Sequence, residues 1–469
     1  MNVYLETYGC QMNLYDSELI QSILIEGGYT LTPSTDDADV VLMNTCAIRE
    51  NAHRKIYGRL DILRPLKKQR EQERRPFVVG VLGCMAQNLK EELLAHPVAN
   101  LVVGPDNYRA LPDLISNIAQ TSAPEISAFL SEYETYSDIA PTRKEGVNAW
   151  LAIMRGCDNF CSFCVVPYTR GRERSRSVES ILQEVRHLVE MGYPQVTLLG
   201  QNVNSYRHEG AVFADLISDV AQVNGLKRVR FTSPHPKDFP EAVLRVIAKN
   251  QNICKHIHLP LQSGSDRILS LMNRTYTAHE YLNVVEMIHS ILPTATITTD
   301  IIVGFPTETE DDFQETVRLM NRVGFNNAYI FKYSERKGTT AARDYPDDIP
   351  EITKTDRIVR LNAQQHEIAF LKHQSCIGQT VQVLIEGDAD KGLDHLTGIA
   401  PQMGKTEGNL TVVFPKTGFQ PGEFVSIGIT ETTAGTLYGK ATDSRRPASV
   451  NGSPLVWSEV GRPSNIKTL

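Results

Sequence analysis

The chain contains Arg155-Gly-Cys-Asp-Asn-Phe-Cys-Ser-Phe-Cys164, a stretch with three cysteines at the spacing Cys-x3-Cys-x2-Cys. The sequence has no fourth cysteine or histidine close by that would complete a set of four. A structural zinc site is normally closed by four protein ligands, whereas three thiolates on a 4Fe-4S cluster leave one iron open. The spacing of Cys157, Cys161 and Cys164 therefore predicts an iron–sulfur centre that takes part in chemistry.

A second set of three cysteines lies in the N-terminal part, each after a short apolar run. Cys10, Cys46 and Cys84 end runs such as Val40-Val-Leu-Met-Asn-Thr, which are typical of strands. Helical patterns follow the first and third of them, so the sheet should be parallel. Ligands of open α/β sheets bind at the shared carboxyl edge of the strands. We therefore predict that these cysteines converge as a second metal site, the alternative being three buried structural cysteines.

The order of elements predicts an α/β protein with three domains. Residues 1–120 alternate strands and helices as a parallel α/β domain, and 121–146 lose this periodicity as a linker would. Residues 147–376 alternate six strand-like runs with helices, which predicts a partial (β/α)6 barrel whose active face lies at the strand C-termini. Short strands over 377–441 predict a small all-β barrel, followed by a loosely ordered tail over 442–469.

Polar residues after the second, third and fourth barrel strands should lie on the same face as the first cysteine set. These candidates for a cofactor pocket are Gly200, Gln201, Asn202, Ser233 and Gln262, with His235 also on this face. The sequence singles out no catalytic side chain.

Composition predicts a globular cytoplasmic protein. Charged residues make up 22% and hydrophobic residues 41%, the N-terminus lacks a signal-peptide pattern, and no apolar run could span a membrane. In a reducing compartment, cysteines at recurring spacings are ligands more often than disulfides. Cys254 and Cys376 match neither spacing, so we expect them to be small buried hydrophobic residues.

The net charge of -7 argues against a general nucleic-acid binder, but basic residues gather in two places. Residues 51–75 contain nine Lys or Arg against three acidic residues, and Arg170, Arg172, Arg174 and Arg176 follow the first cysteine set. Either cluster could contact phosphates, the alternative being a solvated face of the protein.

Nine motifs together resemble the radical S-adenosylmethionine (SAM) methylthiotransferase family, over nearly the whole chain. They are YLETYGCQMN (4–13), NTCAIRE (44–50), GVLGCMAQ (80–87), CSFCVVPYTRGRERSR (161–176), VTLLGQNVNSY (196–206), LPLQSGSDRILSLMNR (259–274), TDIIVGFPTET (299–309), YSERKGTTAA (333–342) and GKTEGNLTVVFP (404–415). The last one resembles a TRAM domain, a small RNA-binding barrel. The Gly-Gly-Glu motif that many radical-SAM enzymes use for SAM is replaced by Gly200-Gln201-Asn202.

The resemblance implies two 4Fe-4S clusters with different tasks. The cluster on Cys157, Cys161 and Cys164 would bind SAM and, once reduced, cleave it to a 5′-deoxyadenosyl radical. The auxiliary cluster on Cys10, Cys46 and Cys84 would hold a sulfur atom that a second SAM methylates. The pocket residues after the barrel strands would then contact SAM.

The implied substrate is carbon 2 of the isopentenylated adenosine next to the anticodon of tRNA, and VTLLGQNVNSY and CVVPYTRG favour it. Alternatives are threonylcarbamoyl-adenosine in tRNA, an aspartate of a ribosomal protein, or a non-catalytic Fe-S or zinc RNA-binding protein. The implied partners are the tRNA anticodon stem-loop, a low-potential electron donor such as flavodoxin or ferredoxin, and a sulfur donor. No membrane partner is expected.

Overall fold

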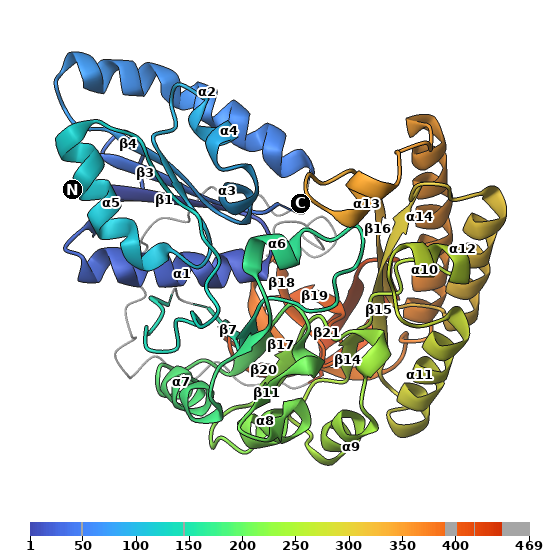
Figure 1. Ribbon diagram of the computed structural model, residues 1–469. Coiled ribbons are helices and arrows are strands. Elements are labelled where there is room, and N and C mark those ends of the chain that lie inside the picture. Colours follow the sequence, from blue (N-terminus) through green and yellow to red (C-terminus); the bar gives the residue numbers. More distant parts are fainter. Residues whose placement is uncertain (48–49, 144–145, 390–400, 417, 443–469) are drawn as a thin grey trace, which may run out of the picture.

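The computed structural model describes residues 1–47, 50–143, 146–389, 401–416 and 418–442. Figure 1 shows an N-terminal sheet with its helices, a central core of strands and outer helices, and a C-terminal barrel that packs against the central core. In the part of the chain that is described, no helix is both long enough and apolar enough to cross a membrane. The tail predicted over 442–469 lies almost wholly outside the described residues.

The N-terminal sheet has six parallel strands in the order β2-β1-β3-β4-β5-β6. Its strands are β1 (Asn2–Tyr8), β2 (Thr30–Leu31), β3 (Val40–Thr45), β4 (Val78–Gly83), β5 (Leu101–Val103) and β6 (Glu125–Ser127). Its helices are α1 (Gln11–Glu26), α2 (Glu50–Gln72), α3 (Cys84–Leu89), α4 (Glu91–Leu94) and α5 (Leu111–Thr121). Separate apolar clusters fill the two faces, which explains why β3 and β4 are buried throughout and read as continuous apolar runs. The predicted parallel α/β domain is confirmed.

The structure differs from the sequence-based prediction over 121–146, which we expected to be a linker. Glu125–Ser127 adds a sixth strand to the N-terminal sheet, and Tyr136 and Ile139 are buried in its core. The Tyr136 hydroxyl donates to the Pro105 carbonyl at 3.0 Å. A strand of three residues and isolated apolar anchors leave no periodic pattern, so the sequence gives no signal for them.

The central core contains two three-stranded parallel sheets, β13-β10-β7 and β14-β15-β16. An isolated bridge between Val229 and Ile253 connects them, which gives the predicted six-stranded partial barrel. The strands are β7 (Asn148–Ala152), β10 (Gln195–Leu199), β13 (Arg228–Phe231), β14 (His256–His258), β15 (Thr296–Val303) and β16 (Asn327–Lys332). Shorter strands beside them are β8 (Met154–Arg155), β9 (Arg174–Ser175), β11 (Arg207–His208) and β12 (Ala211–Val212).

Helices surround these strands and bury a single large apolar cluster against them. They are α6 (Val166–Arg170), α7 (Val178–Glu190), α8 (Phe213–Ala221), α9 (Glu241–Lys249), α10 (Asp266–Leu271), α11 (Ala278–Ile291), α12 (Glu310–Val323), α13 (Thr340–Asp344) and α14 (Glu351–Gln374). Periodic apolar positions on α7 and α12 explain why their sequences predicted helices.

The C-terminal barrel is closed in the order β17-β18-β19-β21-β20, as predicted. Its strands are β17 (Thr380–Asp388), β18 (Pro401–Lys405), β19 (Thr411–Pro415), β20 (Phe424–Thr432) and β21 (Leu437–Ala441). It docks on β13, where Arg228 donates to the Lys405 carbonyl at 2.7 Å and Arg230 to the Thr406 carbonyl at 2.6 Å. These bonds to backbone oxygens fix the barrel against the central core.

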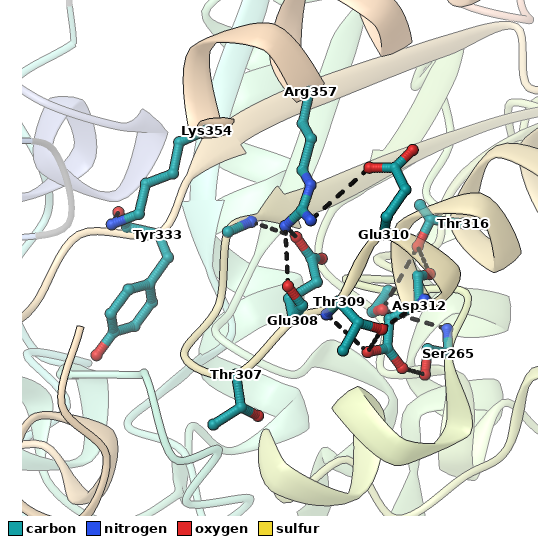
Figure 2. A network of polar contacts seen from close by, with 12 residues as sticks. Ser265, Thr307, Glu308, Thr309, Glu310, Asp312, Thr316, Tyr333, Lys354 and Arg357 are labelled. Atoms are coloured by element: carbon teal, nitrogen blue, oxygen red, sulfur yellow. Dashed lines mark hydrogen bonds and ion pairs between the residues drawn. The ribbon is translucent and has the colours of Figure 1, made fainter. Parts of the chain in front are cut away.

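A buried ion pair holds the loop that follows β15 (Figure 2). The Glu308 carboxylate accepts hydrogen bonds at 2.6 Å from the Gly304 amide and from Nη1 of Arg357 on α14. Glu308 is 2% exposed, and burial raises its pKa to about 7. Arg357 also lies over the Phe313 ring. The pair therefore connects this loop to the long helix that leads into the C-terminal barrel.

We predict that Arg357→Met lowers the midpoint of thermal unfolding more at pH 8 than at pH 6. Without the guanidinium, the pKa of Glu308 in the folded state rises further above its value in the unfolded state. Between these two pKa values the folded state binds more protons than the unfolded state, so the free energy of unfolding falls as pH rises. The loss reaches about 3 kcal/mol once the buried carboxylate is ionised.

Arg360→Met is the matched control, because Arg360 also lies over Phe313 but pairs with the more exposed Glu310. Its effect should stay below about 1 kcal/mol at both pH values. Equal losses in the two variants at pH 8 would contradict a buried pair at Glu308.

Candidate active site

The first cysteine set occupies the loop between β8 and α6. The Cys164 amide donates to the Cys161 carbonyl at 2.9 Å, and the Cys157 amide donates to the Gly171 carbonyl at 3.1 Å. Gly156 has φ +80, and a Cβ there would lie 1.9 Å from the Arg172 carbonyl oxygen. Only glycine permits this close approach, which brings the start of the cysteine loop against Gly171 and Arg172.

The first set of thiols lies in surroundings that disfavour free charge. Burial raises the pKa of Cys157 to about 11 and that of Cys164 to about 12, and the neighbouring Cys161 thiolate adds to both shifts. Nη1 of Arg274, itself buried, donates to Cys161 Sγ at 3.3 Å. Metal coordination deprotonates such thiols outright, so the pocket suits a cationic iron–sulfur core better than free thiolates.

The second cysteine set meets at the carboxyl edge of the N-terminal sheet, where the sequence placed it. Cys10 follows β1 at the start of α1, and Cys84 follows β4 as the first residue of α3. A hydrogen bond with Cys46 is the main cause that lowers the pKa of Cys10 to about 6. A Cβ on Gly9 would lie 2.8 Å from Cys46 Cβ, so glycine lets β1 and β3 present their cysteines side by side.

Neither set is arranged as ligands of a single ion would be. Among the described residues, no three Cys, His, Asp or Glu side chains form a group that could hold one metal ion. An iron–sulfur cluster binds each cysteine through a different iron atom, so its ligands need not converge on one point. What the two sets share is three neighbouring cysteines held in buried or half-buried positions.

A buried ion-pair junction joins the N-terminal sheet to the central core beside both cysteine sets. Asp16 on α1 accepts from Arg155 Nη2 at 2.6 Å and from Arg170 Nη2 at 2.7 Å. Nε of Arg170 then donates to Cys84 Sγ at 3.2 Å. Val165, the residue after Cys164, packs against Cys84 in a small apolar cluster. The two cysteine sets are therefore neighbours across the junction.

The junction corrects the prediction that Arg170, Arg172, Arg174 and Arg176 contact RNA. Three of these side chains are buried, and their partners are Asp16 for Arg170, Asp106 for Arg174 and Glu184 for Arg176. Arg172 alone is exposed, at 69% of its side chain. Asp16 and Asp106 lie far from these arginines in the sequence, so the spacing of the basic residues could not reveal that Arg170 and Arg174 pair with the N-terminal domain.

The basic segment 51–75 forms most of α2, on the outside of the N-terminal sheet (Figure 1). Part of its charge is used within its own domain: Arg59 pairs with Glu6, and the buried Arg70 donates to the Asp36 carbonyl. This segment therefore offers less free charge than its composition indicates.

Exposed aromatic and apolar side chains near the first cysteine set, here called the aromatic rim, were not predicted from the sequence. Phe129, Leu130, Tyr133 and Tyr168 are exposed, Tyr133 to 86%. The Arg172 guanidinium stacks over the Phe160 ring at 4.5 Å, and that ring packs edge-on against Tyr168. Leu130 lies next to Gly171, which brings the segment after β6 to the same place. Scattered aromatic residues in loops carry no periodicity, so only the fold reveals that they gather.

The candidate cofactor pocket contains buried polar atoms that lack protein partners. Gln201 Oε1, Gln262 Oε1 and His235 Nε2 are all buried and make no hydrogen bond within the described part of the protein. Such atoms are rare in folded proteins unless a water or a ligand satisfies them. Gln262 and Ser233 also have positive φ values of +71 and +60, a strain that collects at functional sites.

The other two candidates in this pocket have structural contacts. Asn202 is 2% exposed and accepts a hydrogen bond from the His235 amide at 3.2 Å. A Cβ on Gly200 would lie 2.7 Å from Met154 Cγ, so glycine allows the backbone to approach β8. These two residues therefore have structural roles, whereas Gln201 and Gln262 each keep a buried amide oxygen without a partner among the described residues.

The remaining cysteines stand apart from both sets. Cys254 is buried, as predicted, and Cys376 is only partly buried against the C-terminal barrel core.

Comparison with known proteins identifies the family. Residues 151–320 match the radical SAM superfamily, 2–104 match the uncharacterized protein family UPF0004, and 374–442 match the TRAM domain. The chain is 46% identical to the tRNA-2-methylthio-N(6)-dimethylallyladenosine synthase of Porphyromonas gingivalis, over 94% of this chain and 95% of that protein. It is 48% identical to the synthase of the same name from Chloroherpeton thalassium, over 94% and 96%.

The chain belongs to the MiaB-type tRNA-2-methylthio-N(6)-dimethylallyladenosine synthase family.

Solved structures resemble this MiaB-type protein in fold. The radical S-adenosylmethionine methyltransferase TsrM from Kitasatospora setae matches with a TM-score of 0.54 at 15% identity, over 73% of this chain and 77% of that chain. The cobalamin-dependent radical enzyme OxsB matches with a TM-score of 0.53 at 14% identity, over 79% and 62%. At this identity the likeness concerns the fold alone.

We predict that the anaerobically reconstituted MiaB-type protein holds about eight irons per chain. Replacing all three cysteines of either set with alanine should reduce this to about four, because each set would hold one cluster. The measurement is iron and acid-labile sulfide per chain. Cys254→Ala is the control and should keep the full content, since Cys254 lies outside both sets. Two zinc ions per chain in place of iron would contradict the assignment.

Proposed function

We propose that this protein replaces the hydrogen on carbon 2 of the isopentenylated adenosine next to the tRNA anticodon with a methylthio group. One SAM is the methyl donor and another is the radical source. The observation that carries the proposal is the junction itself: two sets of three thiols lie next to each other across buried ion pairs. A reaction that joins a substrate radical to a methylated sulfur needs two such centres within reach of one substrate.

The residues fit the two proposed clusters. Cys157, Cys161 and Cys164 would hold one 4Fe-4S cluster, and Cys10, Cys46 and Cys84 the auxiliary one, each with one iron left open. When bound, the clusters supply the electron that cleaves SAM and a site for the transferred sulfur. The thiols lie in buried or half-buried positions, so the protein keeps water away from reactive species.

The pocket residues would orient SAM. Gln201 and Gln262 offer buried amide oxygens that can accept hydrogen bonds from the amino groups of SAM. Burial lowers the pKa of His235 to about 2, so this imidazole is neutral; its Nδ1 accepts from the Lys237 amide, which leaves Nε2–H as a donor. These side chains bind and position, and no protein acid or base is needed to remove hydrogen from carbon 2.

The aromatic rim is the proposed entrance for the anticodon loop. Unpaired RNA bases stack on aromatic rings and on arginine planes. Tyr168 and Arg172 present such surfaces beside the first cysteine set, and Tyr133 is exposed three residues after Leu130, which lies next to Gly171. The target adenosine must leave its stack to reach a buried site, which a rim of stacking partners makes less costly. The C-terminal TRAM barrel would contact another part of the same tRNA.

The proposal requires two further partners. Reduction of a cluster needs a low-potential donor such as flavodoxin or ferredoxin, and repeated turnover needs a sulfur donor. A tRNA substrate places the proposed reaction in the cytoplasm, without a membrane partner.

The two cysteine sets should separate into two activities. We predict that Cys161→Ala abolishes release of 5′-deoxyadenosine from SAM, because the cluster that binds SAM loses one of its three ligands. Cys84→Ala should still release 5′-deoxyadenosine but yield no methylthiolated nucleoside. The readouts are 5′-deoxyadenosine by liquid chromatography and methylthiolated nucleoside by mass spectrometry. Methylthiolated tRNA from both variants would refute this division of tasks.

Substitution at the rim should weaken RNA binding without affecting the clusters. Stacking contributes about 1–3 kcal/mol per base, so the double variant Tyr133→Ala and Tyr168→Ala should raise the Kd for an anticodon stem-loop by about tenfold or more. Fluorescence anisotropy measures the Kd. Phe370→Ala is the control, because Phe370 is also an exposed aromatic residue but lies on α14. An unchanged Kd in the double variant would exclude the rim as the entrance.

A further inference from the structure

We propose that Arg170 is the positioning residue of the auxiliary centre: its guanidinium, delivered from α6, holds anionic sulfur at Cys10, Cys46 and Cys84. This inference rests on the proposed function, because it assigns an electrostatic partner to one of its two clusters. Arg170 lies six residues after Cys164, yet its Nε donates to Cys84 Sγ at 3.2 Å. It thus belongs to the loop of one centre and contacts a ligand of the other.

The guanidinium is fixed in place. Its Nη2 donates to Asp16 Oδ2 at 2.7 Å, and the Asp16 side chain is fully buried at 0% exposure. Tyr108 and Arg155 surround the same carboxylate, with Arg155 donating at 2.6 Å and the Tyr108 hydroxyl at 3.5 Å. Side chains held on several sides cannot change rotamer freely, so the donors of Arg170 keep one direction.

One donor of Arg170 remains unused. The Arg170 side chain is only 4% exposed, and its Nη1 is buried. This atom nevertheless makes no hydrogen bond within the described residues. A charged N–H group left unpaired inside a protein is strongly unfavourable. The guanidinium faces this cysteine set, because its Nε already donates to Cys84 Sγ. The unused donor indicates a partner with negative charge.

The local charge count leaves one positive charge without a carboxylate. Arg155 and Arg170 share the single carboxylate Asp16. The other buried arginines nearby are balanced, Arg174 by Asp106, and Arg143 with Arg176 by Glu18 with Glu184. A 4Fe-4S core bound by three thiolates is negatively charged, and so is hydrosulfide. The surplus positive charge therefore matches an auxiliary centre that holds a negatively charged cluster or hydrosulfide.

Two properties of the auxiliary centre should follow. A fixed positive charge stabilises the more negative, reduced form of a cluster, so Arg170 should raise its reduction potential. A guanidinium donor aimed at the cluster should also strengthen binding of hydrosulfide, because hydrogen bonds between charged groups are about twice as strong as neutral ones. Neither property depends on tRNA or on cleavage of SAM.

The test uses full-length reconstituted protein, with sodium sulfide as the probe and the electron paramagnetic resonance signal of the auxiliary cluster as the readout. We expect Arg170→Met to bind sulfide at least about tenfold more weakly and to lower the reduction potential of that cluster. Release of 5′-deoxyadenosine from SAM reports on the other centre, and we expect the loss of sulfide affinity to exceed any loss of this activity. Wild-type sulfide affinity and potential in Arg170→Met would overturn the proposal.

Arg155→Met is the matched control, because it removes the same charge from the same carboxylate but not the contact with Cys84. It should weaken sulfide binding less than Arg170→Met does, and equal losses would overturn the claim of direct contact. If Arg170→Met fails to hold the auxiliary cluster, Arg170→Lys decides, since it keeps the charge and loses the planar set of donors. Sulfide affinity below wild type supports the proposal, and unchanged affinity overturns it.

The same measurements separate this inference from the proposed function. If the wild-type protein binds two clusters but leaves tRNA unmodified, the proposed function fails, and the comparison of sulfide affinities still decides the role of Arg170.

Discussion

The ion pairs of Asp16 with Arg155 and Arg170 are the interaction on which the site depends. Removing three charged groups from water raises the free energy of the folded state, and their mutual attraction offsets this only while they remain in contact. Because the carboxylate belongs to the N-terminal sheet and the arginines to the central core, separation of the domains would leave buried charges unpaired. The two cysteine sets therefore keep a fixed relation across a boundary that would otherwise permit motion.

This junction explains how two unrelated architectures form one site. Each domain ends its parallel strands at an edge that faces the other, and each edge carries three cysteines. Glycines permit the close approaches, at Gly156 in the first loop and at Gly9 beside Cys46. The C-terminal barrel is fixed to the central core by Arg228 and Arg230 through backbone oxygens. The fold thus brings the two cysteine sets together across one domain boundary.

Much of the fold follows from the sequence, because local patterns carry it. Val40–Thr45 and Gln195–Leu199 are apolar runs between turn residues, and their strands appear where predicted. The cysteine sets were found because spacing and position after a strand are local properties. Partners of charged residues are not local: nothing near Arg174 in the sequence indicates Asp106, and exposed residues such as Tyr133 have no pattern. The sequence therefore predicted the centres but misassigned the arginines between them.

The substrate is the part of the account that one measurement tests most directly. The reconstituted protein would be incubated with SAM labelled in its methyl group, reductant, sulfide, and a mixture of isopentenylated tRNA and ribosomal proteins. Both would then be digested and analysed by mass spectrometry. The account predicts a labelled methylthio group on the isopentenylated adenosine next to the anticodon. A label on threonylcarbamoyl-adenosine or on a ribosomal-protein aspartate, or no label in any product, would contradict it.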